Sequence, residues 1–170
     1  PSLVAGNIVF PAAAGGTAGE ALPRLKAAMD AYGVREYIIL ERGGRKIGVF
    51  GLIGREAASN APLAGVEFAD PVAAARRIVG TLLQSEQVDL VVCLSHSGTR
   101  EAPAVSEDEI LAREVPGIDV IISAHTHRQL EQPLRVGRTL LCSAGEYGEN
   151  LGILRLAAAD AGWDLAGYRL

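Results

Sequence analysis

Several patterns are missing from this sequence of 170 residues. Its net charge is -4 and no cluster of lysine or arginine occurs, so it lacks the basic stripe that releases counterions from a nucleic acid. No apolar run approaches the roughly 18 residues of a membrane span, and no charged-then-apolar signal segment opens the chain. We therefore expect no nucleic-acid partner and no membrane span.

Cysteine and methionine are scarce as well. The two cysteines, Cys93 and Cys142, lie inside apolar runs, where a free thiol behaves as a small buried hydrophobe. A disulfide between them stays open, because sequence alone does not establish the required geometry. Residue 1 is proline and the only methionine is Met29, which suggests a piece cut from a longer protein. With 49% hydrophobic residues, the chain can still form the core of a single domain, residues 1–170.

The distribution of apolar residues predicts an α/β fold. The first half should contain a strand at 2–10, a loop at 11–19, a short helix at 20–32, and a hairpin of strands 37–42 and 46–53 around Gly43-Gly44. The second half should contain buried strands at 90–94 and 119–124, followed by antiparallel strands at 139–143, 151–156 and 163–170. The run at 90–94 is continuously apolar, as expected of a strand covered on both faces.

Two further helices are predicted, one before the first buried strand and one between the two buried strands. Asp70-Pro71 is a strong helix start, because aspartate caps backbone N–H groups and proline has none to leave unsatisfied. The apolar face of this helix comprises Val72, Ala75, Ile78, Val79, Leu82 and Leu83. Residues 106–109, Ser-Glu-Asp-Glu, fit a capping box, and Pro116-Gly117 should end the second helix. Strand, helix and strand then form a βαβ-like passage with parallel pairing.

All three histidines lie where a metal could use them. His96 ends the first buried strand, and His125 and His127 flank one threonine at the end of the second. Both strands should deliver these side chains to the same edge of the sheet, where ligands bind in open α/β folds. A lone histidine is usually a hydrogen-bonded residue, but neutral imidazole is also the commonest metal ligand. The joint pattern makes metal binding and a purely structural role about equally good interpretations.

Other polar residues near these strand ends have weaker claims. Ser97 and Ser143 lack the surroundings of a nucleophile and are better interpreted as turn residues. Arg100 and Arg128 follow the histidines closely enough to meet a phosphate, although solvated loop arginines are the simpler interpretation. Residues 146–148, Glu-Tyr-Gly, either line a cleft or connect a hairpin. The sequence therefore names no catalytic residue.

The sequence resembles the calcineurin-like metallophosphoesterases, in their 5′-nucleotidase branch. Residues 94–98, Leu-Ser-His-Ser-Gly, are similar to the family's Leu-Ser/Thr-His-Leu-Gly motif. Residues 116–127 match the next part of the family pattern, a strand that ends in a Gly-His-Thr-His signature, with Ala124 in place of the glycine. Residues 144–152 resemble the next stretch, and the resemblance extends back through Asp70-Pro71 and the hairpin to Asn7.

This resemblance implies a partial four-layer αββα sandwich, with mixed sheets inside and helices outside. It also implies two divalent metals, zinc or manganese, with His96 and His125 on one ion and His127 on the other. Two such ions hold the phosphate and lower the pKa of a bridging water. The expected substrate is a nucleotide or another phosphate ester, and the expected location is periplasmic, cell-surface or extracellular.

The main departures of the sequence from the family are missing motifs. The Asp-x-His, Gly-Asp and Gly-Asn-His-Asp/Glu motifs, which supply the remaining ligands, do not occur in it, and neither does the C-terminal substrate domain of this branch. The chain should therefore be the C-terminal half of a metallophosphatase domain that binds metal weakly or not at all, and is inactive alone. A hydrolase of cyclic nucleotides, nucleotide sugars or sulfur esters, or a non-catalytic binding or assembly module, is the alternative. An exposed sheet edge predicts a homo-oligomer.

Overall fold

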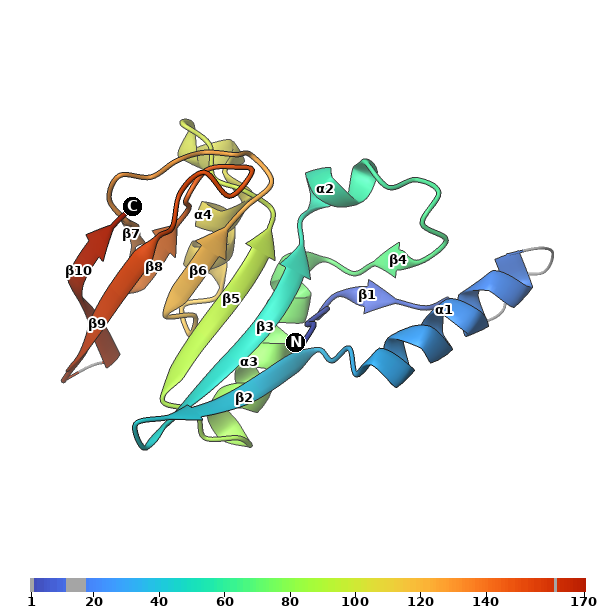
Figure 1. Cartoon of the computed structure of the whole chain (residues 1–170), viewed down its shortest axis with the longest axis horizontal. Helices are drawn as coiled ribbons and strands as arrows, with labels where there is room; N and C mark the ends of the chain where they lie inside the picture. Colours follow the sequence, from blue (N-terminus) through green and yellow to red (C-terminus); the bar gives the residue numbers. More distant parts are fainter. Residues whose placement is uncertain (1, 12–17, 161) are drawn as a thin grey trace.

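The computed structural model describes residues 2–11, 18–160 and 162–170. Its central feature is a six-stranded mixed sheet with the strand order β2-β3-β5-β6-β8-β7, accompanied by two-stranded sheets β1-β4 and β9-β10 (Figure 1). The elements are β1 (Ile8–Val9), α1 (Ala18–Tyr32), β2 (Tyr37–Arg42), β3 (Arg45–Ile53), α2 (Arg55–Ser59), β4 (Glu67–Phe68), α3 (Pro71–Gln84), β5 (Leu90–His96), a 3-10 turn (Pro103–Val105), α4 (Glu107–Glu114), β6 (Val120–Ser123), β7 (Leu134–Val136), β8 (Thr139–Cys142), β9 (Ile153–Ala159) and β10 (Gly162–Arg169).

The predicted hairpin and parallel strands are confirmed. β2 pairs antiparallel with β3 through Gly43 and Gly44, both at positive φ, as a tight turn between twisted strands requires. β3, β5, β6 and β8 run parallel, so their carboxyl ends share one edge of the sheet. The strand at 139–143 was expected to be antiparallel to its neighbours. In the structure this strand, β8, is parallel to β6 and antiparallel only to the short strand β7.

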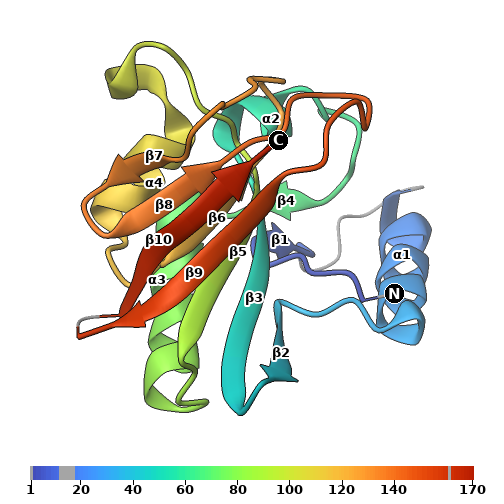
Figure 2. The same cartoon turned by 60° about the vertical axis from the view of Figure 1, so that its left-hand side comes forward.

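Helix α3 begins where the sequence predicts. The Asp70 carboxylate accepts a hydrogen bond from the Ala73 backbone N–H at 2.9 Å, and Pro71 occupies the first turn. Ile78 and Leu82 on its apolar face are fully buried, together with Phe50 of β3. Leu83 was predicted to share this face but is 44% exposed. Figure 2 shows α3 and α4 behind the large sheet and β9-β10 in front of it.

The predicted capping box at residues 106–109 is wrong. The side chain of Ser106 makes no cap hydrogen bond to α4 and instead accepts one from the backbone N–H of Arg100 at 3.1 Å. The serine side chain is therefore used to hold the preceding loop, because that loop folds back beside the helix start. Helix α4 still ends before Pro116-Gly117, as predicted.

One face of the large sheet is only partly covered, which contradicts the two-sided burial predicted for residues 90–94. Leu94 and Ile122, paired across β5 and β6, are 43% and 40% exposed. To bury this face, another segment of polypeptide would have to pack over the middle of the sheet. Among the described residues this face meets the N-terminal segment at residues 2–8 on one side and Leu154 and Tyr168 of β9-β10 on the other. An apolar run does not reveal whether such a layer is present.

The N-terminal region agrees with the sequence in part. The predicted strand at 2–10 is reduced to β1, which pairs with β4, plus a bridge from Val4 to Arg35. The predicted loop at 11–19 lies mostly outside the described residues, and its last two residues begin α1. Helix α1 confirms the prediction for residues 20–32 and projects away from the large sheet (Figure 1).

Both cysteines are buried free thiols, as their apolar surroundings predict. Burial raises the pKa of Cys142 to about 11 and raises that of Cys93 as well. No helix in the described part of the chain is long and apolar enough to cross a membrane. The result is the α/β class that the sequence predicts, with a mixed sheet and helices outside.

Candidate metal centre

His96 and His125 meet at the carboxyl edge of the large sheet. His96 is the last residue of β5, and His125 lies two residues beyond the end of β6, its parallel neighbour. Their ring centroids are 4.9 Å apart and the ring planes are inclined by 61°. Partial burial lowers the pKa of His96, and nearby charge on His125 and His127 lowers it further. This favours the neutral imidazole, the form that binds metal.

The turn that carries the other two histidines has an unusual backbone. His125 has φ 78° and His127 has φ 56°, values in the left-handed region that residues with a side chain rarely adopt. Such conformations cost free energy and are typically kept at functional positions. Because both residues are turned in this way, the chain after β6 presents two imidazoles within three residues.

The neighbouring turn after β5 is locked against this one. Gly98 has φ +93°, and a Cβ atom there would lie 2.3 Å from the Thr126 methyl carbon, so the position admits only glycine. The Thr126 hydroxyl donates to the carbonyl oxygen of Thr99 at 2.9 Å. These contacts hold the two histidine-bearing turns in a single arrangement.

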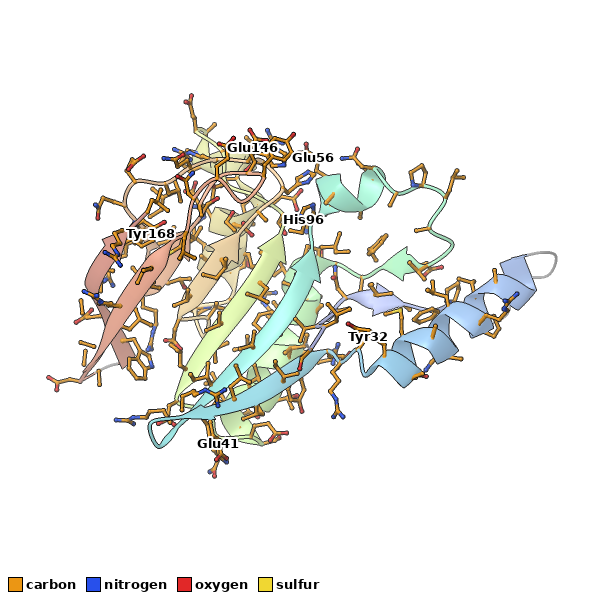
Figure 3. The ribbon with its side chains drawn as sticks, in the orientation of Figure 1. Tyr32, Glu41, Glu56, His96, Glu146 and Tyr168 are labelled. Carbon is orange, nitrogen blue, oxygen red and sulfur yellow. The ribbon has the colours of Figure 1, made fainter. Side chains whose placement is uncertain are left out.

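His127 is held by a different partner from the other two. Its Nδ1 lies 2.5 Å from Oε2 of Glu146, and its ring stands edge-on to Tyr147 with centroids 5.8 Å apart. A carboxylate on one ring nitrogen leaves the other, Nε2, to face a metal. Residues 146–148 therefore do border the histidines, the first of the two interpretations considered for them. Figure 3 shows Glu146 and Glu56 at the same end of the molecule as His96.

Glu56 was missed from the sequence. It lies in α2, one residue into the helix that follows β3, and its Oε1 is 3.8 Å from Nε2 of His125. It also forms an ion pair with Arg100, and the hydrogen bond from that guanidinium keeps the pKa of Glu56 below its usual value. The only available signal was its place after a strand of the same parallel sheet, at the same edge.

The structure uses the remaining candidate residues to support the turns. Arg128 donates to the carbonyl oxygen of Arg100 at 2.8 Å, and the Arg100 side chain pairs with Glu56, so both arginines considered for a phosphate have partners within the protein. Ser97 is buried and hydrogen-bonded to Ser95 at 2.8 Å. The Ser143 hydroxyl donates to the carbonyl oxygen of Arg128. Both serines are thus engaged in hydrogen bonds that hold the turns, in line with their interpretation as turn residues.

These residues fit a divalent metal in part. Two adjacent imidazoles suit zinc or manganese, and His127 with its carboxylate partner has the arrangement of a metal-ligating histidine. Among the described residues, however, no group of three or more histidine, cysteine, aspartate or glutamate side chains is arranged to hold an ion. The donors present are compatible with the metal, but their number does not close a site.

Comparisons with known proteins agree on a single family. No family model matches the chain. It is 32% identical over 134 residues to the trifunctional nucleotide phosphoesterase YfkN of Bacillus subtilis, covering 76% of this chain and 9% of that protein. It is 34% identical over 111 residues to a probable 5′-nucleotidase of Treponema pallidum, covering 64% and 17%. The structure of a 5′-nucleotidase precursor from Thermus thermophilus superposes with TM-score 0.73 and 26% identity, covering 99% of this chain and 32% of that one.

The chain belongs to the calcineurin-like metallophosphoesterases. Within this family it is similar to the 5′-nucleotidase branch, which confirms the resemblance found in the sequence and the predicted partial αββα sandwich. Membership in this metallophosphoesterase family implies the use of divalent metal. The chain spans about a third or less of the length of each relative named above.

Proposed function

We propose that this chain is the C-terminal half of the metallophosphatase domain of a 5′-nucleotidase-like hydrolase that cleaves phosphate monoesters of nucleotides. The observation that carries the proposal is the pair of imidazoles, His96 and His125, 4.9 Å apart at the carboxyl edge of the parallel strands. The relatives named nucleotide phosphoesterase and 5′-nucleotidase support the substrate class.

The three histidines would divide between two ions. His96 and His125 would bind one metal, zinc or manganese, and His127 would bind the other through Nε2, with Nδ1 held by Glu146. Bound metals would hold the phosphate and supply an activated water. The contribution of this chain is to hold three imidazoles in fixed positions, on turns locked by Gly98 and Thr126. The remaining ligands would come from another segment of the parent protein.

A count of ligands leads to the expected activity. Two imidazoles for one ion and one for the other leave both sites open, so the chain alone should bind divalent metal weakly and hydrolyse esters negligibly. Hydrolysis of a nucleoside 5′-monophosphate is to be measured with manganese, for this chain and for the product of the whole reading frame that contains it. Turnover by the whole product alone supports the proposal. Equal turnover by this chain would contradict the division of ligands, and none by either would contradict the substrate class.

Two further candidates follow from particular observations. The first candidate is a parent that acts on a cyclic nucleotide, a nucleotide sugar or a sulfur ester. Among these, the sulfur ester has a structural neighbour behind it, the sulfate thiohydrolase SoxB of Thermus thermophilus, whose fold is similar with TM-score 0.64 at 24% identity. Assay of the whole product on each ester class separates these reactions. The second candidate is a non-catalytic binding or assembly module, in which the histidines would bind no metal because the described residues hold no closed group of ligands. A reading frame that encodes no Asp-x-His or Gly-Asn-His upstream of this segment would support that candidate.

The expected location and assembly belong to the same proposal. A nucleotide hydrolase of this branch would act in the periplasm, at the cell surface or outside the cell. Strand β2 is an edge of the large sheet, with Leu40 37% exposed on it, and this edge would pair with another copy. Sedimentation equilibrium of the chain tests the assembly, and a monomer at every concentration would contradict it.

A further inference from the structure

A buried carboxylate lies directly beneath the two histidine-bearing strand ends. Asp108, in the first turn of α4, has 0% of its surface exposed. It accepts hydrogen bonds from the Ser95 hydroxyl at 2.6 Å, the Ser123 hydroxyl at 2.5 Å and the Gly98 backbone N–H at 3.0 Å. Its own N–H donates to the carbonyl oxygen of Gly98 at 3.1 Å.

Each donor to this carboxylate adjoins a proposed ligand. Ser95 immediately precedes His96, and Ser123 lies two residues before His125. The two serines are paired across β5 and β6, so the carboxylate spans the ends of both strands. Gly98 belongs to the turn after His96 and contacts Thr126, which separates His125 from His127. A single side chain therefore fixes the spacing of both turns.

Burial of this carboxylate is costly, because a buried charge loses its hydration. Loss of hydration raises the pKa of Asp108, and its hydrogen-bond donors only partly offset that effect. If this position only filled space between helix and sheet, an apolar side chain would fill it without the free-energy cost of burying a charge. The position uses a carboxylate because it must accept three donors from two different strand ends.

We propose that Asp108 is the positioning residue of the metal centre and sets the separation of His96 and His125 from beneath the sheet edge. In this role it does not touch a metal or the substrate. The part of this inference that concerns metal rests on the proposed function, whereas the part that concerns the geometry of the turns does not.

The chain offers a matched control at the opposite end of the same strands. Asp119 is a partly buried carboxylate whose pKa is likewise raised by loss of hydration, and it accepts a hydrogen bond from the Val91 N–H at 2.9 Å where β5 begins. Arg138 donates to it at 3.3 Å. Removal of Asp119 disturbs the same two strands but leaves the histidine-bearing turns untouched.

The experiment compares Asp108→Ala with Asp119→Ala in two measurements on the chain. The first is Co²⁺ affinity, followed by the visible absorption of the bound ion, and the second is amide hydrogen exchange in the metal-free proteins at residues 97–99 and 124–127. Asp108→Ala should weaken Co²⁺ binding by about 10- to 100-fold, as loss of a supporting residue around a metal site does. It should also speed exchange at both turns, whereas Asp119→Ala should do neither.

Asp108→Asn separates geometry from charge. An amide can turn its oxygen toward Gly98 and Ser123, while the Ser95 hydroxyl rotates to accept from its nitrogen, so all three contacts are kept. This variant should bind Co²⁺ with an affinity within about threefold of wild type, because a threefold change corresponds to less free energy than the loss of one hydrogen bond. A loss as large as that of the alanine variant would overturn the positioning role in favour of a charge effect.

The two proposals fail in different ways. If wild type does not bind Co²⁺, the proposed metal centre fails, and the exchange measurement alone decides the role of Asp108. If Asp108→Ala leaves both the affinity and the exchange at wild-type values, the positioning role is overturned whatever the metal does. Should Asp108→Ala not fold, Ser123→Ala removes one of the three donors and is expected to show the same effects at smaller size.

Discussion

The imidazole rings of His96 and His125 lie 4.9 Å apart on the ends of neighbouring parallel strands. His127, two residues farther along, turns instead to Glu146. This division between a histidine pair and a separately held histidine is what two adjacent metal ions would require. It also leads to the first prediction.

Loss of either member of the pair should remove the same binding event. His96→Ala and His125→Ala should each weaken Co²⁺ binding at least tenfold, and the double variant should lose little more than either single one, because both act on one ion. His127→Ala should leave the affinity of this ion nearly unchanged. Co²⁺ titrations of the four variants measure this. Additive losses from His96 and His125 would contradict a shared ion.

Glu146 should fix which nitrogen of His127 carries the proton. With its carboxylate 2.5 Å from Nδ1, the ring is expected to be protonated there and to leave Nε2 bare. Nitrogen NMR of the imidazole should show the Nδ1–H tautomer in wild type and a mixture of tautomers in Glu146→Ala. Glu149→Ala, on the same turn, is the control that should leave the spectrum unchanged. The same tautomer in wild type and Glu146→Ala would contradict the assignment.

Stability should depend on the contact between α3 and the large sheet. Phe50 is fully buried beside Ile78 and Leu82, so Phe50→Ala should lower the free energy of unfolding by about 3–5 kcal/mol. Leu63 is 96% exposed, and Leu63→Ala should change it by less than about 0.5 kcal/mol. Urea denaturation of both variants provides the measurement. Equal losses would show that the core lies elsewhere.

Acid should remove the contribution of the α3 cap. The hydrogen bond from the Ala73 N–H, and then the contact with Arg55, hold the pKa of Asp70 below its usual value. The charged form is therefore favoured by folding, and its stabilisation is present above the unfolded pKa of about 3.9 and disappears as pH falls through the lower folded pKa. Asp70→Asn keeps a good cap without the charge. The advantage in unfolding free energy that the charge gives wild type over this variant should shrink as pH falls below the unfolded pKa of about 3.9, and a difference that stays constant with pH would contradict the assignment.

Local patterns predicted much of this molecule, and long-range contacts account for what they missed. Alternation and spacing located the hairpin, the start of α3 and the strands that end near the histidines, because these features depend on neighbours in sequence. Other contacts depend on how separate loops meet. These are the hydrogen bond from the Arg100 N–H to the Ser106 hydroxyl, and the approach of Glu56 and Glu146 to the histidines. A run such as Leu90–Leu94 likewise does not indicate whether a second layer covers it.

X-ray absorption at the zinc edge of the chain loaded with one equivalent of Zn²⁺ tests the central claim most directly. The account predicts two imidazoles at about 2.0–2.1 Å, those of His96 and His125, with water completing the shell. The imidazole scattering should be reduced to one ring in His96→Ala and unchanged in His127→Ala. A zinc ion with no imidazole, or one held by all three histidines together, would contradict the account.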